Sequence, residues 1–290
     1  MAQYQPIRVP VKQRRRSLGC VTPGCILLLL LPVILILAVY LLVPLRINLL
    51  LMGIDRPPSG TNTSRTDTMI LFSIDPLKPD IEMLSIPRDL WVSIPGVGEN
   101  RINTAHFFAE VNDPGSGPQA AAQTVEDNFG ISVPYTIRIR FDDFVHLIDS
   151  MGGIDLTLDS PEGGLAAGKH HLNGTQALAF ARDRKGTDDF FRMADGQIMF
   201  KTVLQQMLRV SNWPRIPFEA ITIFKAMDTN IPAWQWPRLL FAFLRAGPSG
   251  IHNQVLPRTM VTPYVTDAGA DVLLPNWDLI RPFVAKMFGQ

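Results

Sequence analysis

The chain has 290 residues, 47% of them hydrophobic and 18% charged, which is enough for one large domain with a buried core and an appendage. Its net charge is +1, but five basic residues and no acid lie within positions 1–23. The rest of the chain therefore carries 22 basic and 26 acidic residues. This balance argues against a nucleic-acid-binding body. Both cysteines, Cys20 and Cys25, precede the body, which excludes a disulfide framework, a thiol nucleophile and a cysteine metal site there.

An uncharged apolar segment covers residues 24–45. Its 22 positions, at about 1.5 Å each in a helix, are long enough for a hydrocarbon core of about 30 Å, so the segment predicts a transmembrane helix. A cleaved signal peptide is disfavoured because the run is too long and no small-residue cleavage pattern follows. The basic cluster predicts that residues 1–23 form a basic cytoplasmic tail and that residues 46–290 form a domain outside the cell membrane.

The first half of that domain shows strand patterns separated by turn formers. Residues 47–52 read as a buried strand that ends at Gly53, and residues 57–64 read as a loop. The runs Met69–Ile74 and Ile81–Ile86 flank a cluster of turn residues and predict a hairpin. Residues 91–98 read as irregular.

Further along the chain, helical and strand patterns alternate. Helices are predicted from Asn103 as a cap to Glu110, over 120–129 with Gly130 as the stop, over Asp142–Ser150, after Asn173 as a cap, and over about 189–209. Strands are predicted over Pro134–Phe141 and Ile154–Leu158, with a loop from Gly163 to His171. Residues from 211 onward predict two or three helices and a hairpin.

Two aspartates lie where predicted strands end and begin. Asp55 follows the first strand and Asp67 precedes the hairpin, with the loop of turn formers between them. An aspartate in such a place caps a turn more often than it binds metal. Mg²⁺ nevertheless takes only one or two carboxylates and completes its shell with water and phosphate oxygens, so this pair is sufficient for a magnesium site.

Arginines gather at predicted element boundaries in two short regions: Arg65, Arg88, Arg101, Arg182, Arg184 and Arg192. A single arginine of this kind usually forms a surface ion pair worth under about 1 kcal/mol. Guanidinium forks also grip phosphate oxygens bidentately, and the clustering of the arginines favours a site for a pyrophosphate.

Seven strings in order resemble the LytR-CpsA-Psr family of cell-envelope proteins. They are Gly53–Asp55, Arg65–Thr68, Ser85–Asp89, Arg101–Ala105, Met151–Gly153, His171–Gly174 and Gln176–Arg184. The resemblance covers roughly residues 47–208, and the combined pattern is far more specific than any one motif. A short basic tail and one membrane span before the domain are also similar to this family.

The resemblance implies a three-layer α/β/α sandwich around a mixed central sheet. It implies a membrane-anchored phosphotransferase that uses Mg²⁺ to move a glycopolymer from a polyprenyl-pyrophosphate carrier to a cell-wall acceptor such as peptidoglycan. Asp55 and Asp67 match the family's metal-associated acids. Its pyrophosphate-binding arginines are matched by Arg65, Arg88, Arg182 and Arg184. Further members of the substrate site are expected at Asp89, Arg101, Asp189 and Arg192.

The expected reaction is attack of an acceptor sugar hydroxyl on the phosphorus nearer the sugar, with lipid phosphate leaving. The arginines and Mg²⁺ would neutralise the charge on the transferring group, and Asp67 or Asp89 is a candidate for taking the proton. Two alternatives stay open. With water as the acceptor the same site is a pyrophosphatase, and without chemistry it is a lipid-intermediate-binding or regulatory protein.

The sequence departs from the family pattern after Arg192. Where the family's helix often continues with an Arg-Gln pair, this chain has Asp195 and Gly196. An acid in place of a base is expected to weaken phosphate attraction there, and a glycine costs a helix about 1 kcal/mol relative to alanine. The departure bears on the choice of substrate more than on the chemistry.

Overall fold

The computed structural model describes residues 23–42, 46–55, 57–75, 78, 80–183, 189–208, 227–247 and 249–288. The chain divides into two compact units, Met1–Leu42 and Val43–Gln290. The division falls close to the predicted start of the domain at residue 46.

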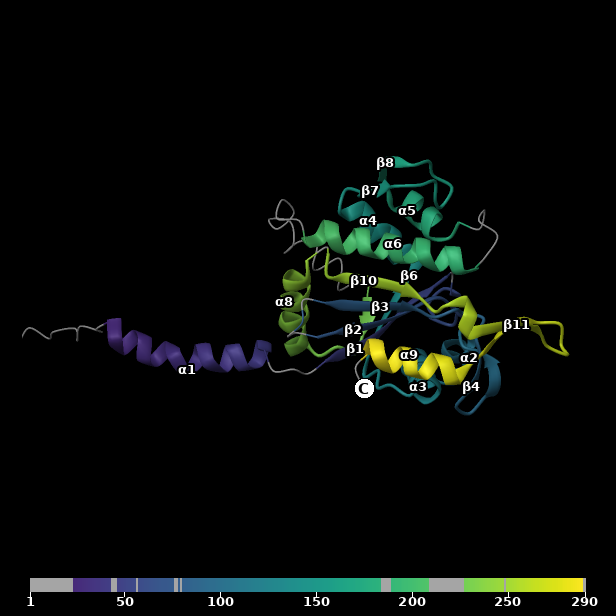
Figure 1. Ribbon diagram of the computed structural model, residues 1–290, viewed down its shortest axis with the longest axis horizontal. Helices are drawn as coiled ribbons and strands as arrows, with labels where there is room; N and C mark the ends of the chain where they lie inside the picture. Colours follow the sequence, from purple (N-terminus) through teal and green to yellow (C-terminus); the bar gives the residue numbers. More distant parts are fainter. Residues whose placement is uncertain are drawn as a thin grey trace, which may run out of the picture. The chain divides into compact units, whose positions relative to one another are not determined.

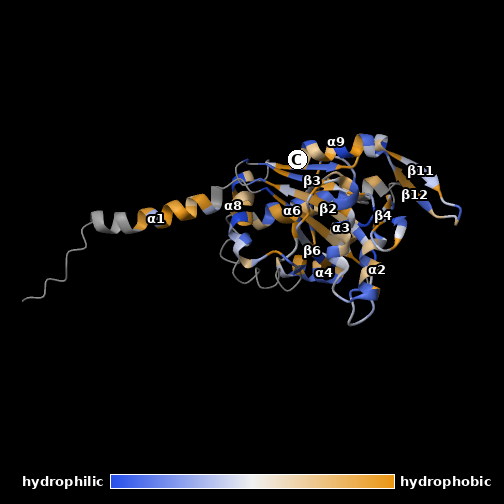
Figure 2. Ribbon diagram, turned by 90° about the horizontal axis from the view of Figure 1, so that it is seen from below, coloured by the Kyte–Doolittle hydropathy of each residue, from blue (hydrophilic) through white to orange (hydrophobic). Residues whose placement is uncertain are grey.

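The first unit contains one helix, α1 (Pro23–Leu42), with Pro32 inside it. Its described side chains from Leu30 to Val39 are mostly apolar and exposed, and its described turns are orange in Figure 2. Among the residues searched, which are those that the structure describes, none of the helices meets the length and hydropathy needed to cross a bilayer. The last three residues of the predicted span, 43–45, lie outside the described part.

The second unit is built on a mixed six-stranded sheet with the order β10-β3-β2-β1-β6-β9 (Figure 1). Its strands are β1 (Ile47–Ile54), β2 (Thr66–Ile74), β3 (Ile81–Ser85), β6 (Tyr135–Arg140), β9 (Met227–Thr229) and β10 (Ile251–Val255). The pairs β1–β6 and β3–β10 are parallel, and the other neighbours are antiparallel. The α/β class with a mixed central sheet is therefore confirmed.

Strand β1 carries apolar side chains on both faces, which is why its sequence is an unbroken hydrophobic run. Leu50 and Met52 belong to one core cluster, whereas Ile47, Leu49 and Leu51 belong to another. This alternation is the period of two that a strand imposes on its side chains. Both faces of the sheet are consequently buried.

Helices cover the two faces of the sheet. The first cluster includes side chains of α3 (Gly117–Phe129) and α9 (Trp277–Phe288), which lie together in Figure 1. The second includes side chains of α8 (Trp236–Ala246) and α6 (Asp189–Leu208). A third core joins α6 to α4 (Phe141–Ser150), to α5 (Gly174–Ala181) and to the ladder of β7 (Ile154–Leu158) with β8 (Gly168–Leu172).

The remaining elements are short. They are β4 (Trp91–Ile94), β5 (Gly98–Arg101), α2 (Thr104–Asn112), β7 (Ile154–Leu158), β8 (Gly168–Leu172), η2 (Ala233–Gln235), η3 (Arg258–Met260), β11 (Val261–Val265) and β12 (Asp271–Pro275). The pairs β4–β5, β7–β8 and β11–β12 form two-stranded antiparallel ladders.

Two predicted loops are strands, so those predictions were wrong. Residues 91–98 were expected to be irregular, but they form β4 and the turn that leads to β5, with Gly96 at a φ of 75°. Part of 163–171 is β8, whose polar side chains are largely exposed and show no apolar alternation. Its strand conformation comes from pairing with β7, which a pattern search cannot detect.

Two further details differ from the sequence predictions. Asn103 precedes α2 in an αR conformation and its side chain makes no capping hydrogen bond, so the predicted cap is wrong. After residue 211, helices α8 and α9 and the hairpin β11–β12 were foreseen, but the sheet strands β9 and β10 were not. Residues 209–226 lie outside the described part.

Candidate functional site

Asp55 and Asp67 are brought together by the pairing of β1 with β2. Asp55 directly follows β1, and Asp67 is the second residue of β2. The antiparallel register shifts between Gly53, opposite Thr68, and Ile54, opposite Thr66, so Asp67 occupies a β-bulge. Bulges commonly re-aim a side chain next to an active site. Here the bulge places the Asp67 carboxylate at the same edge of the sheet as Asp55.

The neighbouring strand end contributes Phe141. Because β1 and β6 are parallel and Ile54 pairs with Arg140, the residue after each strand lies at the same edge. A Cβ on Gly53 would lie 2.7 Å from Cε1 of Phe141, so the ring packs directly against the β1 backbone and a larger residue at position 53 would displace it. The ring in turn supports a guanidinium: Cζ of Arg182 lies 5.1 Å from its centroid.

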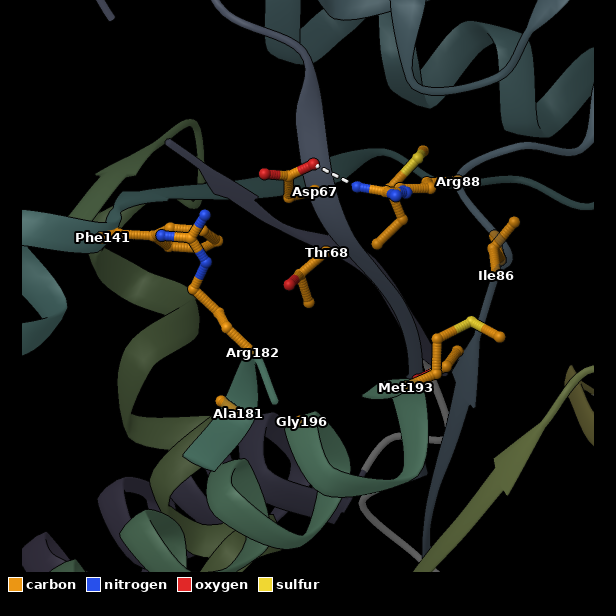
Figure 3. Close-up of a pocket in the computed structure, with 11 residues that line it drawn as sticks. Asp67, Thr68, Ile86, Arg88, Phe141, Ala181, Arg182, Met193 and Gly196 are labelled. Carbon is orange, nitrogen blue, oxygen red and sulfur yellow. Dashed lines mark hydrogen bonds and ion pairs between the residues drawn. The ribbon is translucent and has the colours of Figure 1, made fainter. Parts of the chain in front are cut away.

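Arg182 is positioned by helix α5, which it ends. The helix begins in a capping box between Asn173 and Gln176. It also lies tightly against α4, since a Cβ on Gly174 would come within 2.2 Å of the Val145 carbonyl oxygen. The start of α5 and its packing against α4 are thus fixed, and the Arg182 side chain is directed to the edge of the sheet (Figure 3).

Two arginine–carboxylate pairs form the polar part of the site. Nη1 of Arg88 donates to Oδ1 of Asp67 at 2.9 Å, and Nη2 of Arg182 donates to Oδ2 of Asp55 at 2.7 Å. The four side chains are between 20% and 31% exposed, so all can reach a ligand from solvent. The two arginines come from segments almost a hundred positions apart in the sequence and meet at one sheet edge.

Asp89 and Arg101 extend this network away from the two aspartates. Asp89 lies 3.4 Å from Nε of Arg88 and 3.3 Å from Nε of Arg101. Arg101 also donates from Nη2 to the Asp271 carbonyl oxygen of β12 at 2.7 Å. Because Asp89 bridges two guanidinium groups, it is better suited to orienting Arg88 than to accepting a proton from a sugar hydroxyl.

A pocket of about 520 Å³, including its open mouth, lies against these residues. Its polar lining consists of Asp67, Thr68, Ser85, Arg88 and Arg182. Its other lining residues are mostly apolar: Met69, Ile86, Phe141, Ala181, Met193 and Gly196. Figure 3 shows the polar side chains of Asp67 and Arg88 on one side and Met193 and Gly196 on another. The pocket therefore combines a charged region with an apolar wall.

The other predicted site residues either do not line the pocket or lie outside the part of the chain that the structure describes. Arg65 is exposed in the segment before β2 and is not among the residues that line the pocket. Arg184 lies outside the described residues. Asp189 and Arg192 belong to α6, but their side chains lie outside the described part. Asp67, Arg88 and Arg182 are the predicted residues that share the pocket.

Asp195 and Gly196 have different positions relative to the pocket. Gly196 lines it, whereas Asp195 is only 5% exposed and does not. Burial raises the pKa of Asp195 to about 6, with Glu162 and Asp183 adding to the effect. The expected weakening of phosphate attraction by Asp195 stays a prediction; the structure adds that this side chain is buried near Glu162 and Asp183 and does not line the pocket.

The sequence profile of the LytR_cpsA_psr family matches residues 44–274. This range includes every element of the site. The chain belongs to the LytR_cpsA_psr family.

Individual members of the family agree in sequence and in fold. A polyisoprenyl-teichoic acid–peptidoglycan teichoic acid transferase, TagU of Oceanobacillus iheyensis, is 41% identical over 145 residues, which is 48% of this chain and 44% of that protein. The crystal structure of Bacillus subtilis TagV has a TM-score of 0.68 at 25% identity, over 84% of this chain and 97% of that one.

A third similar protein was solved with a lipid. The structure of TagT with bound octaprenyl pyrophosphate has a TM-score of 0.62 at 21% identity, over 84% of this chain and 91% of that one, and at this identity it shows the fold alone. In sequence, the matched region spans about half the length of the curated relatives, 44% and 57% for two of them.

The LytR_cpsA_psr site also contains residues that were not predicted as site residues, namely Thr68, Ser85, Phe141 and Met193, although Thr68 and Ser85 lie within the strings that resemble the family. Phe141 was read as the last residue of an alternating strand, but it begins α4 beside Asp55. The signal that could have found it is the parallel pairing of β1 and β6, because the carboxyl ends of parallel strands meet at one edge. Single-sequence patterns do not reveal that pairing.

Among the residues that the structure describes, protein side chains alone do not form a metal cage. Within the described residues, no group of three or more His, Cys, Asp or Glu side chains is arranged to hold a metal ion. Asp55 and Asp67 each accept a hydrogen bond from an arginine, Asp55 from Arg182 and Asp67 from Arg88. Such a donor set fits Mg²⁺, which is usually held by one or two carboxylates and by phosphate oxygens of the substrate.

Proposed function

We propose that this protein is a transferase that moves a glycopolymer from a polyprenyl-pyrophosphate carrier onto a cell-wall acceptor such as peptidoglycan. Membership of the LytR_cpsA_psr family supports this proposal. So does the name of the TagU relative, a teichoic acid transferase to peptidoglycan.

The observation that carries the proposal is the mixed character of the pocket. Arg88 and Arg182 present guanidinium groups to one cavity, and each is held by an aspartate. Guanidinium forks match the oxygens of a pyrophosphate. The adjoining Met69, Ile86, Phe141 and Met193 offer an apolar surface of the kind that suits an isoprenoid chain. A lipid pyrophosphate has both chemistries in one molecule.

In the proposed reaction a hydroxyl oxygen of the acceptor attacks the phosphorus nearer the sugar. A new phosphorus–oxygen bond forms, the bond to the bridging pyrophosphate oxygen breaks, and the lipid monophosphate leaves while the hydroxyl proton passes to a base. Arg88 and Arg182 stabilise the negative charge on the transferring group and the leaving phosphate, which is the main catalytic demand of phosphoryl transfer. Phe141 keeps the Arg182 guanidinium in place.

Magnesium is proposed as the cofactor. Asp55 and Asp67 would hold it, and when bound it would supply positive charge to the pyrophosphate oxygens. Even without it, the two aspartates orient Arg182 and Arg88. Substituting either aspartate by asparagine should weaken the binding of Mg²⁺, measured by calorimetry in the presence of inorganic pyrophosphate. Unchanged binding by both variants would remove the metal from the proposal.

We also propose that the body is a three-layer α/β/α sandwich outside the cell, anchored through residues 24–45. The layers are supported by the helices that pack on both faces of the sheet. The anchor and orientation rest on the uncharged segment and the basic residues before it. The body lacks cysteine, so Glu99→Cys in a Cys20→Ser, Cys25→Ser background should react with an impermeant maleimide on intact cells. Labelling only after lysis would contradict this orientation.

Product analysis tests the transferase against the hydrolytic alternative. The full chain would be supplied with a polyprenyl-pyrophosphate-linked polymer, with and without peptidoglycan. We expect polymer covalently joined to peptidoglycan, together with released polyprenyl monophosphate, only when the acceptor is present. Equal release of lipid phosphate without acceptor would identify a pyrophosphatase, and no turnover with retained lipid binding would identify a binding protein.

A further inference from the structure

A line of buried polar groups connects the central sheet to the segment that carries the aspartates. It runs from Arg138 on β6, 3% exposed, to His106 on α2, 0% exposed. Nη1 of Arg138 lies 3.1 Å from Nε2 of His106, and Nδ1 of His106 lies 2.8 Å from the Ser64 carbonyl oxygen. Arg138 also forms ion pairs with Glu110 and Asp228. This line does not touch the pocket.

The partners of His106 determine its tautomer. A carbonyl oxygen can only accept, so Nδ1 must carry the proton that Ser64 receives. A guanidinium can only donate, so Nε2 must present its lone pair to Arg138. One neutral tautomer satisfies both bonds. Burial lowers the pKa of His106 despite the Ser64 bond, and the Arg138 charge lowers it further, which agrees with a neutral ring.

Ser64 connects His106 to the site through hydrogen bonds. Its hydroxyl donates to the carbonyl oxygen of Asp55 at 2.8 Å, and the next residue is Arg65. Two residues on, the Thr66 amide donates to the Asn103 carbonyl oxygen, immediately before α2. The segment between the two aspartates is therefore tied to α2 on one side and to the end of β1 on the other.

We propose that His106 is a positioning residue for the transfer site: its Nδ1–H fixes Ser64, and thereby sets the places of Asp55, Arg65 and Asp67. The inference rests on the proposed function for its catalytic consequence. The anchoring itself is a property of the folded chain. Groups that act on a site through another residue typically change activity or metal affinity by about 10- to 100-fold when removed.

A purely structural role is the alternative, because His106 is fully buried. It is closely packed: a Cβ on Gly117 would lie 2.7 Å from its Cδ2. A packing role depends on the volume of the side chain, whereas the positioning role depends on a donor at the place of Nδ1. Variants of similar size that differ in the location of the donor therefore separate the two.

The test compares His106→Asn, whose amide nitrogen stands near the place of Nδ1, with His106→Gln and His106→Leu. We expect His106→Asn to keep transfer within about tenfold of the wild type and the other two to lose about 100-fold. The loss should fall in kcat, with binding of octaprenyl pyrophosphate changed less. Hydrogen exchange of residues 57–67, measured without substrate, should quicken in the Leu and Gln variants and stay slow in the Asn variant.

The pH profile gives a further readout. The charged groups that face His106 are Arg138, Glu110 and Asp228, beside the Ser64 carbonyl. Protonation of Nε2 would oppose the Arg138 guanidinium, so wild-type transfer should fall on acidification below the ordinary histidine value of 6.5. His106→Asn should lack that acid limb. A limb of the same midpoint in His106→Asn would count against the inference.

Two results would overturn the proposal: a folded His106→Leu protein that transfers like the wild type, or equal losses in all three variants with unchanged exchange of residues 57–67. Failure of the proposed function looks different. In that case the wild type itself would neither bind octaprenyl pyrophosphate nor transfer polymer, while the exchange measurement would still report whether His106 anchors the segment.

Discussion

Arg88 and Arg182 each form an ion pair with an aspartate before any substrate is present. These pairs are partly exposed, so each contributes little to the free energy of folding, about 1 kcal/mol at most. Their value is geometric, because each aspartate holds a flexible arginine in one orientation at the pocket. Under the proposed function, a pyrophosphate would meet donors that are already in place.

Gly196 lines the pocket without filling it with a side chain. It lies inside α6, has no positive φ, and a Cβ there would meet nothing within 4 Å, so the backbone does not require glycine. A glycine inside a helix nevertheless costs about 1 kcal/mol relative to alanine. The missing side chain leaves open space in the pocket that a larger residue would fill.

Substituting Gly196 should therefore separate stability from activity. Gly196→Ala should raise the free energy of unfolding by about 1 kcal/mol and leave transfer near the wild-type rate. Gly196→Phe should raise KM for the lipid-linked polymer about tenfold or more by occupying the pocket. Gln205→Leu, on the same helix but not lining the pocket, is the matched control. A wild-type KM in the Gly196→Phe protein would show that the substrate does not occupy the pocket space beside residue 196.

At the residue scale, the sequence indicated the charged groups but not their surroundings. Asp67, Arg88 and Arg182 were predicted because arginines and acids cluster at strand and helix ends. Phe141 and Thr68 were not, because an aromatic ring or a threonine near a strand end carries no chemical signal. Their place in the pocket depends on strand register and on the bulge at Asp67.

At the scale of single elements, α6 contains an unfavourable buried acid. Asp195 is 5% exposed, and its pKa is raised from 3.8 to about 6 by burial and by Glu162 and Asp183. The folded state thus binds this proton more tightly than the unfolded state does. Stability is therefore highest at low pH with respect to this group and falls as pH rises between about 4 and 6.

Asp195→Asn should remove that penalty. The variant should be more stable than the wild type at pH 7, by about 1–2 kcal/mol, and the difference should shrink as pH falls toward 4. Urea unfolding at the two pH values measures it. Asp267→Asn, in an exposed turn before β12, is the control and should change little at either pH. A difference that is the same at pH 4 and pH 7 would contradict the account of α6.

Elements with their own apolar pattern or cap were predictable, whereas others were not. The β2–β3 hairpin and α5, with its Asn173 capping box, follow from local sequence. Strands β8, β9 and β10 are short, and β8 and β10 carry mostly exposed side chains. They exist because β7, β6 and β3 offer unpaired edges. Only tertiary pairing specifies such strands.

At the scale of the whole molecule, the resemblance to the family predicted more than the patterns did. A mixed α/β body was expected, but no pattern showed that β1 lies between the antiparallel β2 and the parallel β6. That arrangement is what places Asp55, Asp67 and Phe141 at one edge. Arg88 then reaches it from the turn after β3 and Arg182 from the end of α5, almost a hundred positions apart in the sequence.

The central claim is that Arg88 and Arg182 act together on one pyrophosphate. The most direct measurement is transfer of lipid-linked polymer to peptidoglycan by the wild type and by Arg88→Ala, Arg182→Ala and Arg281→Ala, each checked for unchanged thermal unfolding. Arg281 is an exposed arginine on α9 that does not line the pocket. The account predicts loss of about 100-fold or more for each pocket variant and near wild-type transfer for Arg281→Ala. Transfer at the wild-type rate by a folded Arg88→Ala or Arg182→Ala protein would contradict it.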